Sequence, residues 1–219
     1  MLLQCEMENG APAGGALAWL CEGTLESLVE LNESCLTLLA EQAAVRTVPP
    51  SPLLRQVGEL WRMLDGAARR RAAACPYLLL DAGFADAVRW RPPPAQQVGD
   101  AGRALYTSYF TVPGATHVAR LVFTYAWHLA RSQGPAARVL LGMPAPCAAL
   151  IGHRTLGYMQ ALAETRPEWL KPRWPARVQI WRDLLVAAGS GEGAALERAR
   201  LRGLTLLAAE VRLAPSARS

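Results

Sequence analysis

The stretch Thr116–Arg131, THVARLVFTYAWHLAR, decides the expected fold. Its apolar residues recur every three or four positions, which is the periodicity of an α-helix. A helix that is apolar around most of its circumference is usually buried in the middle of a bundle. We therefore expect this segment to be the central helix of an all-α protein. The residues concerned are Val118, Leu121, Val122, Phe123, Tyr125, Ala126, Trp127 and Leu129.

Other segments with helical apolar spacing lie on both sides of this helix, and prolines and glycines separate them. Ser51 followed by Pro52 is typical of a helix start, because proline is favoured at the first helical position. No alternating strand pattern longer than a few residues and no internal repeat at a fixed spacing is visible. The sequence therefore predicts an all-α fold, a multi-helix bundle of about seven to nine helices joined by Pro/Gly-rich turns.

Several boundaries can be tested against a structure. We expect a first helix over about 16–46, a helix over 100–111, and one continuous helix over about 146–165. The apolar segment 77–84, YLLLDAGF, is expected to form a short turn of helix after Pro76. Pro175 is expected to start the next helix.

The expected domain organisation is simple. Residues 1–15 are rich in glycine and proline and predict a flexible leader. Residues 16–213 predict a single helical domain, and residues 214–219 a frayed tail. The three prolines of 89–97, RWRPPPAQQ, favour a polyproline II linker, at which the domain could be subdivided.

Charge is unevenly distributed along the chain, whose net charge is +5. Residues 1–50 hold seven glutamates and one arginine, a net charge of −6, which leaves +11 for residues 51–219. Five cysteines without a CxxC pair predict free thiols. The first ten residues lack the basic start of a secretory signal, and no apolar run reaches the length of a membrane span. We expect a cytoplasmic protein of bacterial type without a membrane partner.

No catalytic motif is recognisable. HExxH, GxxxxGK[ST], GxGxxG and GxSxG are all missing, and the aspartates do not form pairs. The spacing of the histidines and cysteines matches no metal site. We therefore expect no catalytic residue, no metal and no cofactor, and the sequence leans away from an enzyme. A pocket beside His128 and His153 that binds a small molecule is the third option for function.

Mixed tryptophan and arginine residues are the strongest signal outside the core. The candidate partner-binding residues are Arg69, Arg70, Arg71, Trp90, Trp169, Arg173 and Trp174. Such residues can form the hot spots of a protein interface, or stack on bases and neutralise phosphates. Arginine also stacks on tryptophan inside a protein and so fixes proline-rich loops. The sequence leaves these alternatives open.

A narrow polar seam remains on the central helix and includes His117, Arg120 and His128. The two histidines are eleven residues apart, about 16 Å along a helix, so they cannot bind one metal ion together. The seam is either a solvent-facing strip or a polar groove in which Arg120 and His128 bind an anion or a carboxylate of a partner.

The function that these observations favour is a non-enzymatic adaptor or regulatory protein that binds another protein or associates with itself. The alternative is a nucleic-acid-binding transcriptional regulator that uses the arginines at 69–71 and the Trp/Arg segments. Binding of nucleic acid would weaken steeply as salt increases.

Overall fold

The computed structural model of the protein describes residues 20, 22–45, 51–91 and 108–213. This part contains ten α-helices, so the expected all-α multi-helix bundle is confirmed, with slightly more helices than expected. The helices are α1 (Glu22–Ala44), α2 (Pro52–Met63), α3 (Gly66–Ala73), α4 (Ala87–Trp90), α5 (Ala115–Ser132), α6 (Gly134–Leu141), α7 (Ala145–Gly152), α8 (Leu156–Thr165), α9 (Val178–Ser190) and α10 (Gly193–Leu213). A 3-10 helix, η2 (Pro167–Trp169), precedes strand β2 (Lys171–Pro172), which pairs with strand β1 (Leu80–Asp81).

The segment 77–84 is not helical: it contains β1 and ends in a turn, so the helical turn expected there is wrong. The reason lies in Asn32 of α1, whose side chain is fully buried beside this segment. Its Nδ2 donates to the carbonyl oxygens of Ala73 (2.9 Å) and Tyr77 (3.0 Å), and its Oδ1 accepts from the Leu79 N–H (2.8 Å). A distant side chain thus satisfies the backbone groups that a helix would have paired internally.

The single helix expected over 146–165 is also wrong, because it is divided into α7 and α8. Thr155 interrupts it in an extended conformation, with ψ of 154°, and its hydroxyl accepts from the Tyr158 N–H (3.2 Å). This is the geometry of a threonine N-cap.

Other boundaries differ less. The first helix begins at Glu22, and α9 begins at Val178 rather than at Pro175. Residues 108–111 are not helical, and the rest of the helix expected over 100–111 lies outside the described residues. The expected leader over 1–15, the tail over 214–219 and residues 92–97 of the linker lie outside them as well.

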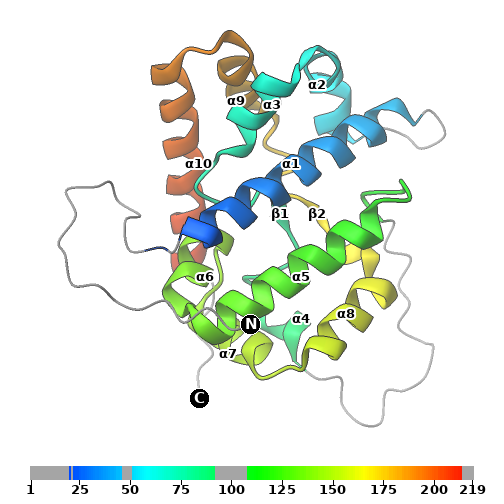
Figure 1. The fold of residues 1–219 in the computed structure, drawn as a ribbon, viewed down its shortest axis with the longest axis vertical. Helices are drawn as coiled ribbons and strands as arrows, with labels where there is room; N and C mark the ends of the chain where they lie inside the picture. The colour runs from blue at the N-terminus through cyan, green and yellow to red at the C-terminus, as the bar shows by residue number, and fades with distance from the viewer. Residues whose placement is uncertain (1–19, 21, 46–50, 92–107, 214–219) are drawn as a thin grey trace.

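Helix α5 has the central position expected of it and packs against α1, α6, α7 and α8 (Figure 1). Val122, Phe123 and Leu129 are completely buried, whereas Leu121 is exposed on the outer face. Helices α1 and α5 lie side by side in opposite directions. Gln42 near the end of α1 accepts from the N–H of Thr111, which precedes α5, and Tyr125 donates to the Thr24 carbonyl at the start of α1.

Two segments repeat the same local structure at an offset of 91 residues, although the sequence alone showed no repeat. We call residues 66–90 the first repeat and residues 157–181 the second repeat. Each runs from a helix (α3 or α8) through a short strand and a turn into another helix (α4 or α9). The identical pairs are Gly66/Gly157, Ala72/Ala163, Pro76/Pro167, Leu79/Leu170, Ala85/Ala176 and Trp90/Trp181.

The register of the strand pair places a local two-fold axis between the strands of the two repeats. Leu80 pairs with Pro172, and Asp81 pairs with Lys171. Exchanging each residue for its counterpart 91 positions away converts the first pair into the second. The helices are arranged in a similar way. Helix α9 of the second repeat packs on α3 and on α2, the helix before α3. Helix α4 of the first repeat packs on α7, the helix before α8. The last helix of each repeat thus packs across the axis on the other half of the molecule.

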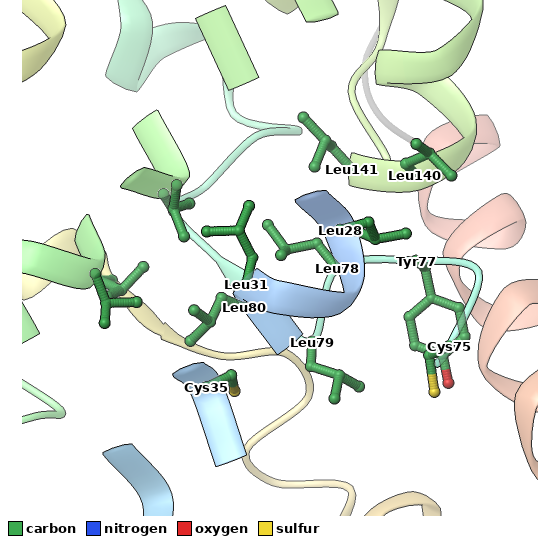
Figure 2. Close-up of a cluster of buried hydrophobic side chains, with 14 of the residues drawn as sticks. Leu28, Leu31, Cys35, Cys75, Tyr77, Leu78, Leu79, Leu80, Leu140 and Leu141 are labelled. Carbon is green, nitrogen blue, oxygen red and sulfur yellow. The ribbon is translucent and has the colours of Figure 1, made fainter. Parts of the chain in front are cut away.

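The core surrounds this axis. The buried apolar side chains form one continuous cluster, to which α1, the segment 77–84 and the helices on both sides of 92–107 contribute. Figure 2 shows Leu28, Leu31 and Cys35 of α1 packed around Leu78–Leu80, with Leu140 and Leu141 of α6 nearby. In the described part of the chain, no single helix is long and apolar enough to cross a membrane. Helices α6 and α7 reach that length only together, across a bend of 117°.

Candidate interaction site

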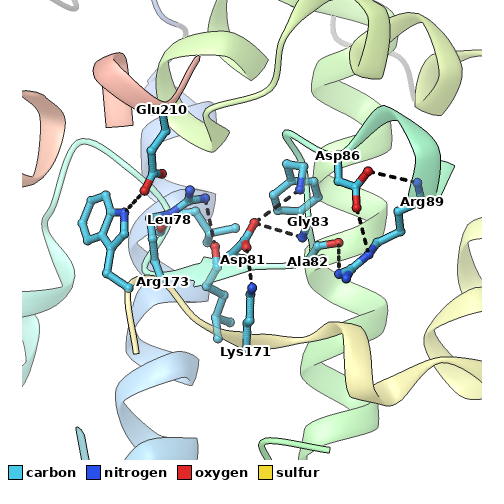
Figure 3. A network of polar contacts seen from close by, with 12 residues as sticks. Leu78, Asp81, Ala82, Gly83, Asp86, Arg89, Lys171, Arg173 and Glu210 are labelled. Carbon is cyan, nitrogen blue, oxygen red and sulfur yellow. Dashed lines mark hydrogen bonds and ion pairs between the residues drawn. The ribbon is translucent and has the colours of Figure 1, made fainter. Parts of the chain in front are cut away.

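Arg173 is a buried cation at the centre of the molecule, beside β2 (Figure 3). Its guanidinium donates to the carbonyl oxygens of Leu78 (2.8 Å), Leu80 (3.1 Å) and Leu141 (3.0 Å). Burial lowers the pKa of Arg173, and the carboxylates of Asp81 and Glu210 oppose this shift. One side chain of the second repeat therefore joins the first repeat to the last residue of α6.

Asp81 of β1 provides the nearest negative charge. Its Oδ1 accepts from the N–H groups of Gly83 (3.0 Å) and Phe84 (3.3 Å), and its Oδ2 lies 3.5 Å from Lys171 Nζ (Figure 3). Burial raises the pKa of Asp81. Arg173, Lys171 and the two N–H groups lower it by more, so the net pKa lies below its ordinary value. The carboxylate is therefore ionised at neutral pH. By accepting from Gly83 and Phe84 it orders the turn that follows β1, which we call the first turn.

The turn after β1 in the first repeat and the turn after β2 in the second repeat hold counterpart residues in the same left-handed backbone conformation. Gly83 has φ of 74°, and its counterpart Trp174 has φ of 52°. Glycine adopts this conformation without strain, whereas a side chain with a Cβ does not. Trp174 compensates through its contacts, because its Nε1 donates to Glu210 of α10 (2.7 Å) and its ring packs on Tyr77, with 5.6 Å between ring centroids.

A cleft of about 530 Å³ lies between the two turns and the end of α10. We call it the central cleft. Its charged lining consists of the cations Arg89, Lys171 and Arg173 and the anions Asp81, Asp86 and Glu210. Most of these groups already have a partner of opposite charge or a hydrogen-bond partner within the protein. Their main role is therefore to hold the turns together.

Helix α10 covers the first repeat. A Cβ atom on Gly203 would lie only 1.9 Å from Tyr77 Oη, so this position of α10 must be glycine. Leu207 similarly packs against Gly142, and the Arg200 guanidinium donates to the Arg71 carbonyl (2.9 Å). Tyr77 and its neighbour Cys75 are consequently 1% and 2% exposed. Burial raises the pKa of the Cys75 thiol to about 12.

The corresponding side of the second repeat is a hollow of about 320 Å³, which we call the open notch. It is lined by Asp86, Val88, Arg89, Arg166, Glu168 and Trp169. Arg166 and Glu168 are the counterparts of Cys75 and Tyr77, and the side chain of Arg166 is 43% exposed. Val88 is 75% exposed at the edge. Among the described residues, no helix covers this side as α10 covers the other.

The tryptophans and arginines named from the sequence take two kinds of position. Trp90, Trp174 and Arg173 are buried, which favours the alternative that they fix the loops internally. Trp90 Nε1 donates to the Gly83 carbonyl (2.9 Å), and its counterpart Trp181 donates through Nε1 to the carbonyl of Arg173 (2.8 Å), one residue before the counterpart of Gly83. Trp169 is half-buried at the open notch, where Arg89 lies over its ring at 5.2 Å. It is the only one of these three tryptophans that is not buried.

The three arginines of α3 are separated by their contacts. Arg71 Nε donates to the Ala188 carbonyl of α9 (2.8 Å), so Arg71 is used in packing. Arg70 is exposed and Arg69 is half-buried. The α3 helix itself is eight residues long and packs against α1 and α9. It therefore offers solvent a single fully exposed arginine.

The polar seam lies on the outer face of α5. His117, Arg120 and His128 are exposed, and Arg120 pairs with Glu164 of α8 (2.7 Å). The pairing leaves Arg120 less available to an anion. His153 lines a shallow depression of about 410 Å³ with Arg131, but His128 is not part of that lining. The structure thus does not bring His128 and His153 together in one pocket.

Helix α1 has a buried apolar face and an acidic outer face. Leu28, Leu36 and Leu39 are at most 1% exposed, and through this face α1 packs on α2, α3 and α5. The outer face carries Glu26, Glu30, Glu33 and Glu41, and the helix contains no lysine or arginine. None of these glutamates has an ion-pair partner among the described residues. The acidic helix is therefore held by apolar packing rather than by charge.

Comparison with other proteins adds no functional information: no family model, no curated protein and no solved structure matches this chain. In the part of the chain that the structure describes, no group of three or more His, Cys, Asp or Glu side chains is placed to hold a metal ion.

Arg89 and Arg166 belong to the two Trp/Arg segments of the sequence, but the sequence does not single out Val88 and does not predict that the two segments meet at one hollow. A signal was present. Pro76 and Trp90 are 14 residues apart, as are Pro167 and Trp181, and each proline is followed three positions later by a leucine.

Proposed function

We propose that this protein is a non-enzymatic adaptor or regulatory protein that binds a macromolecular partner through the outer face of α1. The observation that carries the proposal is the separation of charge on the surface. Glu26, Glu30, Glu33 and Glu41 follow one face of α1 without a described counter-ion. Separated charge of this kind accelerates association with an oppositely charged surface and orients it. The partner is a basic protein surface, either on another protein or on a second copy of this chain.

The experiment compares affinity capture by the full-length protein and by a variant with Glu26→Lys, Glu30→Lys and Glu41→Lys. These three side chains are exposed, so the fold should tolerate the change. The matched control is Glu59→Lys, Glu164→Lys and Glu192→Lys, which changes the net charge equally at exposed positions outside α1. Proteins captured by the wild type and by the control, but not by the α1 variant, would support the proposal.

Self-association is checked separately by sedimentation velocity at low and high salt. An assembly formed through the acidic face should weaken as salt is raised, because exposed charges are screened. An assembly that does not respond to salt, together with equal capture by all three proteins, would contradict the proposal.

The nucleic-acid alternative has less support. Arg71 is used in packing, and the acidic helix α1 packs directly against α3, where it would repel phosphates. Fluorescence anisotropy with duplex and single-stranded DNA and RNA tests this alternative. We expect no binding at physiological salt; tight binding that is lost on replacing Arg69 and Arg70 would reverse the order of the two proposals.

A further inference from the structure

The outer face of α10 is apolar in its middle and carries opposite charges at its two ends. We propose that this face binds the same face of a second copy of the chain, with the two α10 helices antiparallel. The contact lies on a different helix from the acidic face of α1 and goes beyond the proposed function, so either proposal can fail without the other.

Helix α10 runs along one edge of the molecule and packs on α9 and α6 (Figure 1). Gly203 and Leu207 face inward and are buried. Leu201, on the opposite side of the helix, is 59% exposed, and Leu204 is half-buried. A shallow depression of about 580 Å³ on this side is lined by Leu201, Leu204, Thr205, Ala208, Ala209 and Arg212. All of these residues belong to α10, so no other described element contributes to the depression.

The residues along this face are spaced symmetrically. Six positions share the face, and we call them the outer stripe: Glu197, Leu201, Leu204, Thr205, Ala208 and Arg212. Their successive spacings are four, three, one, three and four residues, and this order is the same when read from either end. Two copies of such a stripe therefore meet in register when they lie antiparallel across a two-fold axis between positions 204 and 205.

Antiparallel pairing matches both the size and the charge of the side chains. Leu201 of each copy faces Ala208 of the other, so that a large side chain packs on a small one. Leu204 and Thr205 lie at the axis. At each end of the contact, Glu197 of one copy faces Arg212 of the other. A parallel pair would instead place each residue against itself and bring like charges together, so the charges select the antiparallel orientation.

The two end charges are available for this contact. Arg212 is exposed and has no ion-pair partner among the described residues. Glu197 accepts from Arg200 through Oε1 (2.5 Å), yet its side chain is 61% exposed, and its carboxylate can accept from a second donor. The arginines that flank the stripe, Arg198 and Arg202, are each paired with a carboxylate within the chain. The stripe thus carries one cation without a described partner and one partly used anion, at the separation that an antiparallel copy requires.

The first test is sedimentation velocity of the full-length protein at concentrations up to about 200 µM, because the contact of a single helix pair is small and the dimer is expected to be weak. Leu201→Asp should weaken dimerisation at least about tenfold, since it places a charge in the apolar middle of the contact. The matched control is Val88→Asp on α4, where the side chain is 75% exposed. The control should dimerise like the wild type.

Charge exchange tests which residues face each other. Arg212→Glu should weaken dimerisation about tenfold, because like charges then meet at both ends of the contact. Adding Glu197→Arg to the same chain should restore dimerisation, because each end again joins opposite charges. A double variant that dimerises no better than Arg212→Glu alone would contradict the proposed register.

Cross-linking tests the orientation. A short bis-maleimide should join two copies that carry Thr205→Cys, because position 205 lies at the axis. It should not join two copies through Glu197→Cys, because these positions lie about 22 Å apart along an antiparallel pair. Peptide mass spectrometry distinguishes these adducts from those of the native cysteines.

Three results would overturn the proposal: a dimer that survives Leu201→Asp, a cross-link between two copies at position 197, or a protein that stays monomeric at every concentration. The last result would show that another protein, or another part of this chain, covers the outer stripe. The variant with Glu26→Lys, Glu30→Lys and Glu41→Lys should dimerise normally. If that variant alone were monomeric, the copies would associate through α1, which would support the proposed function and overturn the contact through α10.

Discussion

The first and second repeats have the same order of helix, strand, turn and helix but differ in what covers them. Cys75 and Tyr77 lie under α10, and their counterparts Arg166 and Glu168 lie beside an open notch. Apolar and weakly polar side chains thus occur where a helix covers the turn, and charged ones occur where none of the described helices does. Whether these positions hold apolar or charged side chains therefore follows from whether a helix packs over the turn, and not from the order of secondary structure, which the two repeats share.

The turns make the same point about backbone strain. Gly83 adopts its left-handed conformation freely in the first repeat. Trp174 adopts it in the second because its ring is held by Tyr77 and by Glu210 of α10. The first repeat thus reaches the left-handed conformation with a glycine, whereas in the second repeat tertiary contacts of the tryptophan side chain stabilise it.

The largest effect is expected at Arg173, which has no charged counterpart because Ala82 takes its place in the first repeat. Arg173→Leu removes three hydrogen bonds to buried carbonyl oxygens and leaves Asp81 with less compensation. We expect the free energy of unfolding to fall by about 3–5 kcal/mol. Urea denaturation measures it. The exposed Arg177→Leu is the control, and a loss below about 1 kcal/mol at Arg173 would refute its linking role.

The contact between α10 and the first repeat is tested at Gly203. Gly203→Ala places a methyl group where Tyr77 Oη lies, which should cost about 2–3 kcal/mol of stability. Gly58→Ala in α2 is the matched control, since a Cβ there meets nothing within 4 Å. It should stabilise the protein by about 0.5–1 kcal/mol. Equal effects in thermal denaturation would show that α10 does not pack closely on Tyr77.

The pH dependence of stability tests the charge network between the repeats. The pKa of Asp81 is lowered in the folded state, so its contribution is complete above the pKa of the unfolded side chain, about 3.9. It is lost as the pH falls through the lower, folded value. Asp81→Asn should therefore cost about 2 kcal/mol at pH 7 and progressively less below pH 4. A constant difference in urea denaturation between pH 7 and pH 3 would contradict this account.

A smaller effect is expected at Gly83. Gly83→Ala introduces a side chain at φ of 74°, which should cost about 1–2 kcal/mol. The added Cβ also meets Arg89 Nη1 at 2.6 Å, but this is the end of a flexible side chain that can move. Thermal denaturation provides the measurement. A neutral result would mean that the first turn relaxes to another conformation and is not a strict counterpart of the second.

The smallest effect is expected at the rim of the open notch. Val88→Asp should change the free energy of unfolding by less than about 0.5 kcal/mol, because the side chain is mostly in solvent. Met63→Asp should behave in the same way. A loss of more than 1 kcal/mol at Val88 alone in urea denaturation would indicate that the notch is filled by the protein itself.

The sequence was sufficient to predict the helical class and the central position of α5, because apolar periodicity reports directly on burial. It could not predict that 77–84 is not helical. That outcome depends on Asn32, 45 residues before Tyr77, whose side chain supplies the missing hydrogen bonds. The division of 146–165 carried a local signal, Thr155, but a threonine within an apolar helical pattern does not by itself end a helix.

The candidate site was less accessible to sequence reasoning. The Trp/Arg segments were recognised, but a single sequence cannot distinguish Trp90, which is buried, from Trp169, which reaches the surface. Burial depends on which helix crosses the turn, and α10 lies far along the chain. The repeat escaped notice because only six of its positions are identical, and most of these are small residues or proline.

The most direct test of the central claim compares thiol reactivity at counterpart positions of the two repeats. Native Cys75 and the thiol introduced by Arg166→Cys are labelled with a maleimide in the full-length folded protein, and peptide mass spectrometry follows each site. The account predicts that position 166 reacts at least about 100-fold faster, because Cys75 reacts only when α10 opens. Equally slow labelling at both positions would show that the second repeat is covered like the first and would contradict the account.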